Sequence, residues 1–331
     1  MTKRLLPTHE PQGSWVCQVI FMSGEDSKLP VVLLEKCAGT TSVKCNDVLF
    51  TGSPEEPSAN IVYFGGDLQD FKTEMTKYSE GCEYVQWNLK STARLLHNRF
   101  SSLSRWPNPH VWVIRPSHWV RQSFAAYTNF LPFDERTVPR IGHDLTRFSA
   151  LEQLNRVLHS AVAQMHNTHI DYRTHLRAPL CLIGFSKGCC VLIQMLYELA
   201  YCAYFARELD TSTGPSRSTQ ELLSRLDSIY WLDGGHAGLD NQWPTASNIL
   251  SRLNPTRTPK MYIYGTSYQL MNPHKPWKSR DYHRFLEILR HHNFPHKHGI
   301  LSTASDDSRY TEPSLHSHFE LLRQFPIENS I

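Results

Sequence analysis

The sequence predicts an α/β protein with a mostly parallel sheet and helices on both of its faces. Predicted strands and helices alternate along most of the chain, and each of the later strands is a continuous apolar run. Strands that helices bury on both faces produce such runs, whereas strands with a solvent-facing side alternate between apolar and polar residues. A third observation supports this class, because a glycine-rich turn around Ser186 joins an apolar strand directly to an apolar helix.

The composition indicates a single globular domain. Of the 331 residues, 40% are hydrophobic and 20% are charged, which supplies enough apolar material for a large buried core. We therefore expect one domain over residues 1–331. In this domain, residues 1–60 would form edge strands and a loop, and residues 61–331 would form the core.

The charge distribution argues against nucleic acid as a partner. The chain has 34 Lys and Arg against 31 Asp and Glu, a formal charge of +3, and its basic residues are scattered. No run of about 18 uncharged apolar residues occurs, so we expect no transmembrane segment. Lys3 and Arg4 precede no apolar signal core, and no clear transit peptide follows them, so targeting cannot be read from these residues and a cytoplasmic location stays open as an alternative.

The first third of the chain predicts the sheet edge and one inner strand. Apolar runs at residues 16–22, 31–34 and 48–50 are separated by turn residues, which is typical of antiparallel strands. Residues 51–60 are rich in Pro, Ser and Glu and predict a loop. Residues 61–64 then form a fully apolar strand that ends at a pair of glycines.

The rest of the chain alternates between the two kinds of element. Further strands are expected at residues 111–114, 180–183, 229–232, 261–264 and 298–301. Helices are expected in parts of residues 69–100 and at residues 149–165, 189–209, 282–291 and 315–325.

The strongest chemical signal is the stretch Gly184-Phe185-Ser186-Lys187-Gly188 between a strand and a helix. This arrangement is typical of the nucleophile elbow of the α/β-hydrolase fold, in which small residues flank a strained serine. The helix N-terminus then favours negative charge that develops near the serine hydroxyl. The alternative is an ordinary glycine-rich turn that caps a helix. The strand and helix on either side favour the elbow, and hence an α/β-hydrolase fold with Ser186 as nucleophile.

An acid should follow the nucleophile in this fold. Asp233 comes directly after an apolar strand and before two glycines, which suits a catalytic carboxylate at the carboxyl end of a sheet. Its alternative role is a helix or turn cap. Asp281 is the rival acid, but we expect it to cap the helix that begins near Tyr282.

The base should lie between the last strand and the last helix, where the chain offers His316 and His318. Spacing does not choose between them, because the chain has 18 histidines and most histidines are solvated side chains. His236, three residues after Asp233, is a possible accessory group in the site. A turn histidine needs no catalytic explanation.

An oxyanion hole in this fold uses the N–H after the nucleophile and one N–H from the loop after an early strand. The first donor would be Lys187. The second would come from Gly66, Asp67 or Leu68, where the glycines allow the backbone to approach a substrate. The alternatives are a tight turn without function and a Lys187 side chain that only meets solvent.

Three stretches resemble the eukaryotic family typified by a human chromosome-two open-reading-frame protein. They are Tyr63-Phe64-Gly65-Gly66-Asp67-Leu68-Gln69, Leu182-Ile183-Gly184-Phe185-Ser186-Lys187-Gly188-Cys189 and Tyr230-Trp231-Leu232-Asp233-Gly234-Gly235-His236. The resemblance implies an α/β-hydrolase-like, serine-hydrolase-type protein that is associated with mitochondria and has an undefined substrate. It also favours His318 as the base, since a His-Phe pair recurs near the family's C-terminus. The chain departs from the family in showing no clear transit sequence.

The expected function is a serine hydrolase that cleaves an ester or thioester through Ser186, His318 and Asp233. The alternative is a non-catalytic member of the fold that binds a partner or ligand and supports mitochondrial metabolism, because fold does not dictate function. A metal enzyme is disfavoured, since the chain has neither a His-Glu-x-x-His motif nor paired Cys-x-x-Cys groups. We expect no cofactor, a small-molecule or acyl substrate, and room for a protein partner.

Overall fold

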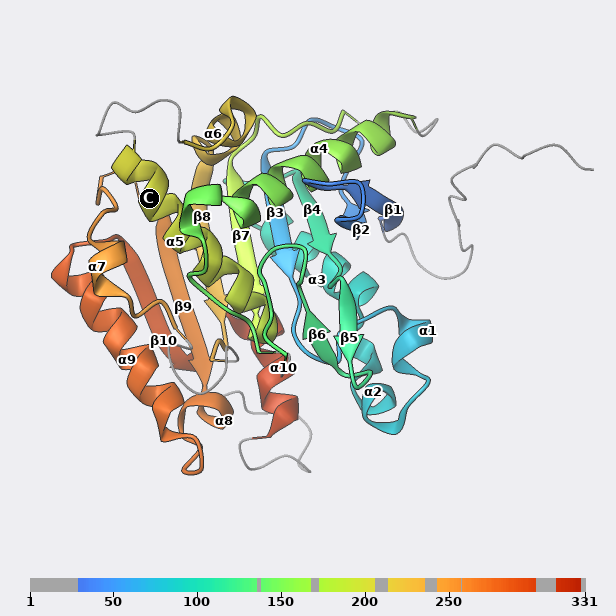
Figure 1. Cartoon of the computed structure of the whole chain (residues 1–331). Coiled ribbons are helices and arrows are strands. Elements are labelled where there is room, and N and C mark those ends of the chain that lie inside the picture. The colour runs from blue at the N-terminus through green and yellow to red at the C-terminus, as the bar shows by residue number, and fades with distance from the viewer. Residues whose placement is uncertain are drawn as a thin grey trace, which may run out of the picture.

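The computed structural model describes residues 29–135, 138–167, 173–205, 214–235, 243–256, 258–301 and 314–328. Among these residues it contains an eight-stranded sheet and a separate two-stranded one (Figure 1). The strands of the large sheet are β1 (Val32–Ala38), β2 (Cys45–Thr51), β3 (Ala59–Phe64), β4 (Pro109–Ile114), β7 (Leu180–Phe185), β8 (Leu226–Leu232), β9 (Lys260–Thr266) and β10 (His296–Leu301).

The order of the large sheet is β1-β2-β4-β3-β7-β8-β9-β10. Only β2 runs against its neighbours, because it pairs antiparallel with both β1 and β4, while every other neighbouring pair is parallel. A mostly parallel sheet with one antiparallel strand next to its first edge is the α/β-hydrolase fold. The predicted fold class and its antiparallel edge are therefore confirmed.

Helices cover both faces of this sheet. The core on one face includes α4 (Ser149–Asn167), α5 (Cys189–Phe205) and α9 (Pro276–His291), and the core on the other includes α3 (Leu89–Ser101) and α10 (Leu315–Gln324). Figure 1 shows α4 and α5 crossing in front of the strands and α3 behind them. The inner strands contribute alternate side chains to the two cores, which explains the continuous apolar runs within them.

Short helical segments connect the main elements. They are α1 (Lys72–Met75), α2 (Ser79–Glu83), η1 (Val85–Trp87), η2 (Leu145–Arg147), η3 (Ser186–Gly188), α6 (Arg217–Leu223), α7 (Ser247–Leu250) and α8 (Ser267–Leu270). Along the whole described part of the chain, every helix is too short or too polar to cross a lipid bilayer.

A small hairpin follows β4 at the end of the sheet where the parallel strands finish (Figure 1). It consists of β5 (His118–Val120) and β6 (Phe124–Ala126), and its turn places Arg121 and Gln122 in left-handed conformations at φ 49° and 66°. Non-glycine residues adopt this conformation at a cost, so surrounding contacts must hold the turn. Those contacts come from the loop after β3 and are described below.

Two sequence expectations are corrected. The helix expected from Tyr282 begins six residues earlier, at Pro276, because proline is well suited to the first position of a helix. Asp281 consequently lies inside α9 and does not cap it. The strand expected at residues 16–22 and the end of the helix expected at residues 189–209 lie outside the described residues.

Candidate active site

Ser186 stands at the corner between β7 and α5. The strand ends at Phe185, η3 spans Ser186–Gly188, and α5 begins at Cys189. Ser186 has a φ of 53°, in the left-handed region that side chains rarely adopt, and the residue is buried. Strain of this kind is typical of functional positions, and it is the feature that distinguishes a nucleophile elbow from a relaxed helix cap.

Two glycines allow the elbow to contact the loop after β3. A Cβ atom on Gly188 would lie 2.1 Å from the carbonyl oxygen of Phe64, so only glycine fits between α5 and the end of β3. A Cβ on Gly66 would lie 2.6 Å from the Cβ of Ser186. The backbone of the loop after β3 therefore passes directly beside the serine side chain.

Asp233 follows the last residue of β8 and is completely buried, with a φ of 51°. Its carboxylate accepts hydrogen bonds from two groups of Thr266 at the end of β9. The Thr266 N–H donates to Oδ1 at 2.7 Å, and the Thr266 hydroxyl donates to Oδ2 at 2.6 Å. These bonds fix the carboxylate at the same end of the sheet as Ser186 and satisfy a charge that would otherwise be costly to bury.

His318 completes the arrangement from the first turn of α10. Ser314 begins this helix with a reciprocal capping box to Ser317, which fixes where the turn starts. The Nδ1 atom of His318 lies 2.6 Å from Oδ2 of Asp233, and its ring lies 4.4 Å, between centroids, from that of Phe185. The imidazole is thus held by the acid and packed on the residue that precedes Ser186.

The next residue, Phe319, packs among aromatic side chains and thereby positions His318. Its ring stacks on Tyr84 at 5.1 Å and on Trp87 at 5.9 Å between centroids. This aromatic packing anchors α10 against the opposite side of the site and leaves the preceding side chain to face Asp233.

The rival residues lie elsewhere. The Nε2 atom of His316 is 3.6 Å from Oε1 of Glu320 on the same helix, so its ring is directed along α10 toward that carboxylate. Asp281 pairs with Arg280, 3.4 Å away. The suggested accessory residue His236 lies outside the described residues.

The loop after β3 contains the three backbone N–H groups that the sequence offered as oxyanion donors, and two of them have partners among the described residues. The Gly66 N–H donates to Oε1 of Gln69 at 2.9 Å, and the Leu68 N–H donates to the carbonyl oxygen of Ser123 at 2.7 Å. The Asp67 N–H donates to no residue in the described part of the chain. Of the expected donors Gly66, Asp67 and Leu68, Asp67 is therefore the one whose N–H has no competing partner in that part of the chain.

Gln69 locks this loop from the inside. Its Oε1 accepts from the Gly66 N–H and from the Tyr63 hydroxyl, 2.7 Å away, and its Nε2 donates to the carbonyl oxygen of Trp87 and the hydroxyl of Thr92. The side chain is completely buried. Four hydrogen bonds from one amide fix the loop against β3 and α3.

We expect Gln69→Leu to destabilise the protein by about 2–4 kcal/mol, because the Tyr63 hydroxyl and the Gly66 N–H would remain buried without an acceptor. Urea unfolding measures this change. Gln86→Leu, on an exposed side chain nearby, is the matched control and should change stability by less than about 0.5 kcal/mol. Equal effects of the two substitutions would contradict the role of Gln69.

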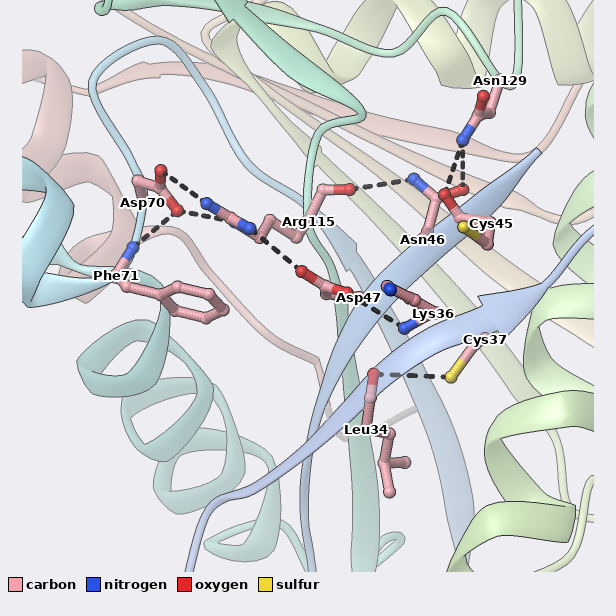
Figure 2. Close-up of polar contacts among 10 residues, drawn as sticks. All are labelled: Leu34, Lys36, Cys37, Cys45, Asn46, Asp47, Asp70, Phe71, Arg115 and Asn129. Carbon is pink, nitrogen blue, oxygen red and sulfur yellow. Dashed lines mark hydrogen bonds and ion pairs between the residues drawn. The ribbon is translucent and has the colours of Figure 1, made fainter. Parts of the chain in front are cut away.

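Arg115 locks the same loop from the outside, as Figure 2 shows. It follows β4, and its Nε and Nη2 atoms donate to the two carboxylate oxygens of Asp70 at 2.7 and 3.0 Å, while Nη1 donates to Asp47 on β2 at 3.0 Å. The guanidinium lies over the rings of Phe71 and Trp119. A bidentate, stacked arginine fixes orientation as well as charge, so the loop after β3 is tied to the sheet edge.

The β5–β6 hairpin is tied to this loop. Oδ1 of Asp67 accepts the Ala125 N–H at 2.8 Å, and the Tyr127 hydroxyl donates to the Gly65 carbonyl oxygen at 3.1 Å. Together with the bond from Leu68 to Ser123, these contacts place the hairpin over the elbow and direct the Asp67 carboxylate toward β6. They also hold the left-handed turn of the hairpin.

Charged groups that sequence reasoning did not single out surround the site. Burial raises the pKa of the Asp67 carboxyl above its ordinary value, and the positive charges of Lys187 and Lys278 offset part of this rise. Lys278 lies in the first turn of α9 and is buried. Lys278 lies 45 residues after Asp233 in the chain, and no sequence motif around it indicated that it would lie near the site.

A cavity of about 610 Å³ opens elsewhere, between β1 and α3. Phe71 belongs to its lining, but Ser186, Asp233 and His318 do not. We therefore base the candidate site on the hydrogen-bonded side chains and not on the size of a cavity. In the described ranges, no group of three or more His, Cys, Asp or Glu residues is arranged to hold a metal ion.

Comparison with known proteins identifies the family. The sequence matches the C2orf69 family over residues 33–174 and 152–295. The chain belongs to this family. The C2orf69 homolog of Danio rerio is 28% identical over 267 residues, which cover 78% of this chain and 72% of the zebrafish protein. The human C2orf69 protein is 25% identical over an alignment that covers 93% of this chain and 86% of its own.

The C2orf69 relatives from zebrafish, mouse and human are named mitochondrial proteins. This confirms the mitochondrial location that the family resemblance implied.

Solved structures resemble the C2orf69 chain in fold. Carboxyl esterase 2 from Tuber melanosporum matches 92% of this chain with 88% of its own, at 9% identity and a TM-score of 0.43. Dienelactone hydrolase from Anabaena variabilis matches 90% with 97% of its own, at 11% identity and a TM-score of 0.41. These likenesses concern the fold alone.

Proposed function

We propose that the protein is a serine hydrolase that cleaves an ester or thioester, with Ser186 as nucleophile, His318 as base and Asp233 as the acid that orients it. The observation that carries the proposal is the 2.6 Å contact between Nδ1 of His318 and Oδ2 of Asp233, with the His318 ring packed on Phe185, the residue before a serine with a φ of 53°. A histidine and an aspartate with a purely structural role could pair anywhere in the fold. The position of this pair, next to the residue that precedes the strained serine, supports a catalytic role.

Each group has one task in this reaction. The Asp233 carboxylate accepts a hydrogen bond from Nδ1–H of His318, which keeps the proton on Nδ1 and leaves Nε2 as the base. Ser186 Oγ attacks the acyl carbon while its proton passes to Nε2. The tetrahedral intermediate then expels the alcohol or thiol, which takes that proton, and the acyl group stays on Oγ.

Water completes the cycle. His318 removes a proton from the water molecule that attacks the acyl carbon, and the same proton returns to Ser186 Oγ as the carboxylic acid leaves. The backbone N–H groups of Lys187 and Asp67 are the proposed donors to the oxyanion in both steps. Each such donor typically contributes roughly 3–4 kcal/mol to transition-state stabilisation.

Labelling with a fluorophosphonate probe tests the proposal. Wild-type protein should form one adduct, located on Ser186 by mass spectrometry, and Ser186→Ala should form none, because the probe requires an activated serine. Ser102→Ala, on an exposed serine at the end of α3, is the matched control and should label like the wild type. Absence of labelling in the wild type would favour the non-catalytic alternative, a protein that binds a partner or ligand in support of mitochondrial metabolism.

A further inference from the structure

Lys278 is a buried lysine beside the candidate site. Only 7% of it is exposed, although lysine is among the residues that proteins bury least often. It is the third residue of α9, after Pro276 at the first position. Its Cγ and Cδ atoms lie 3.6 Å from the point that a Cβ on Gly235 would occupy, so the side chain runs along the turn that follows Asp233.

The ammonium group of Lys278 is close to two carboxylates without being bonded to either. Asp233 and Asp67 both act on it electrostatically. Yet Lys278 forms neither a hydrogen bond nor an ion pair with any residue in the described ranges. The carboxylate of Asp233 already accepts from Thr266 and His318, and that of Asp67 accepts from Ala125.

Two partly buried arginines of this chain, unlike Lys278, form direct ion pairs with carboxylates. Arg115 contacts Asp70 at 2.7 Å with two parallel hydrogen bonds, and Arg105 contacts Asp227 at 2.5 Å. Burying an ammonium without such a partner is unfavourable, and burial lowers the pKa of Lys278 to about 8. Ionisable groups with perturbed pKa values cluster at functional sites, where a ligand can supply the missing partner.

The start of α9 adds to the positive potential around this group. Pro276 has no N–H and the Lys278 N–H donates to the carbonyl oxygen of Lys275 at 3.1 Å, so the helix contributes the positive end of its dipole and not a set of free donors. A negative group that approached Lys278 would meet this positive potential as well as the ammonium. The site thus rests on a largely buried lysine whose ammonium has no hydrogen-bond or ion-pair partner among the described residues, and the helix only reinforces it.

We propose that Lys278 binds an anionic group, a carboxylate or a phosphate, which the substrate carries close to the bond that Ser186 attacks. This inference rests on the proposed hydrolase function and narrows its substrates to anionic esters or thioesters. Lys278 determines specificity and takes no part in proton transfer. A neutral substrate would leave the ammonium buried and unpaired, so it would bind more weakly.

The first test measures binding without catalysis. Thermal unfolding of the full chain is followed with inorganic phosphate, with succinate and with sodium chloride at the same ionic strength. Phosphate, succinate or both should raise the melting temperature of the wild type more than chloride does, because a ligand of the native state stabilises it. Lys278→Met should lose this rise. Lys275→Met, on an exposed lysine at the start of the same helix, should keep it.

The variant also reports on its own folding. Lys278→Met removes a buried unpaired charge, so its melting temperature in chloride should equal or exceed that of the wild type. A lower value would show that the lysine stabilises the fold, which would overturn the proposal. A response to phosphate alone identifies a phosphate group, and a response to succinate alone identifies a carboxylate.

The second test connects the anion to the nucleophile. Phosphate or succinate should slow the labelling of Ser186 by an uncharged fluorophosphonate in the wild type, and Lys278→Met should need roughly tenfold more anion or higher for equal protection. Lys278→Arg keeps the charge and should retain part of the protection. If the wild type is never labelled, the proposed hydrolase fails while the melting test still decides anion binding. If neither anion protects or stabilises the wild type, the Lys278 proposal fails.

Discussion

Asp233→Asn should slow the reaction of Ser186 with esters or fluorophosphonates by roughly 10⁴-fold, a loss typical of this change in serine hydrolases. The Thr266 N–H donates to Oδ1, so the amide oxygen of the asparagine would take that place. Its NH₂ group would then occupy the place of Oδ2 and donate to Nδ1 of His318. The imidazole would carry its proton on Nε2, and Ser186 would lose its base.

Stopped-flow or discontinuous labelling rates measure this loss, and thermal unfolding shows whether the variant is folded. Asp227→Asn, at the opposite end of the same strand, is the matched control because it breaks a bond to Arg105 far from the site. It should leave the labelling rate within about twofold of the wild type. A normal rate in Asp233→Asn would show that the contact with His318 is structural.

Much of the fold could be predicted because its signals are local. The strands at Val62, Leu182 and Trp231 each contain a run of at least four consecutive apolar residues, which follows from helices on both faces and is visible in the sequence. The turn around Ser186 is equally local, since a strand, two glycines and a helix follow one another without interruption. Chain order then brought Asp233 into consideration together with His316 and His318, and the family resemblance favoured His318.

The parts that could not be predicted depend on contacts between distant segments. The start of α9 was missed because proline is common in loops. Pro276 instead occupies the first helical position, where its missing N–H has no cost. Lys278 therefore lay outside the predicted helix, and its position near Asp67 and Asp233 was not visible. The β5–β6 hairpin was missed for another reason, since its turn uses Arg121 and Gln122 at positive φ instead of Asn-Gly.

The sequence alone could not distinguish between the three candidate oxyanion donors. Gly66, Asp67 and Leu68 are consecutive, and which N–H remains available depends on Gln69 and on Ser123 of the hairpin. Such partners become visible only when the loop and the hairpin are placed in space.

Gly188→Ala should destabilise the protein by about 3 kcal/mol or more, the largest effect on stability that we expect from a single methyl group. The added Cβ would lie 2.1 Å from the carbonyl oxygen of Phe64, 2.6 Å from its carbonyl carbon and 2.8 Å from the carbonyl oxygen of Gly65. All three are backbone atoms, so no side chain can rotate to make room. The start of α5 and the end of β3 would have to separate.

This separation would affect the site as well as the fold, because the same loop brings Gly66 against Ser186 and offers the Asp67 N–H. Urea unfolding measures the loss of stability, and labelling of Ser186 in the folded fraction should slow by roughly 10²–10³-fold if one oxyanion donor is displaced. Gly214→Ala is the control, since the nearest atom would be 3.6 Å from its Cβ, in a flexible glutamine side chain. A Gly188→Ala protein as stable as Gly214→Ala would mean that α5 and β3 do not approach so closely. A destabilised variant that labels at the normal rate would instead show that the close packing at Gly188 stabilises the fold but is not required for the reactivity of Ser186.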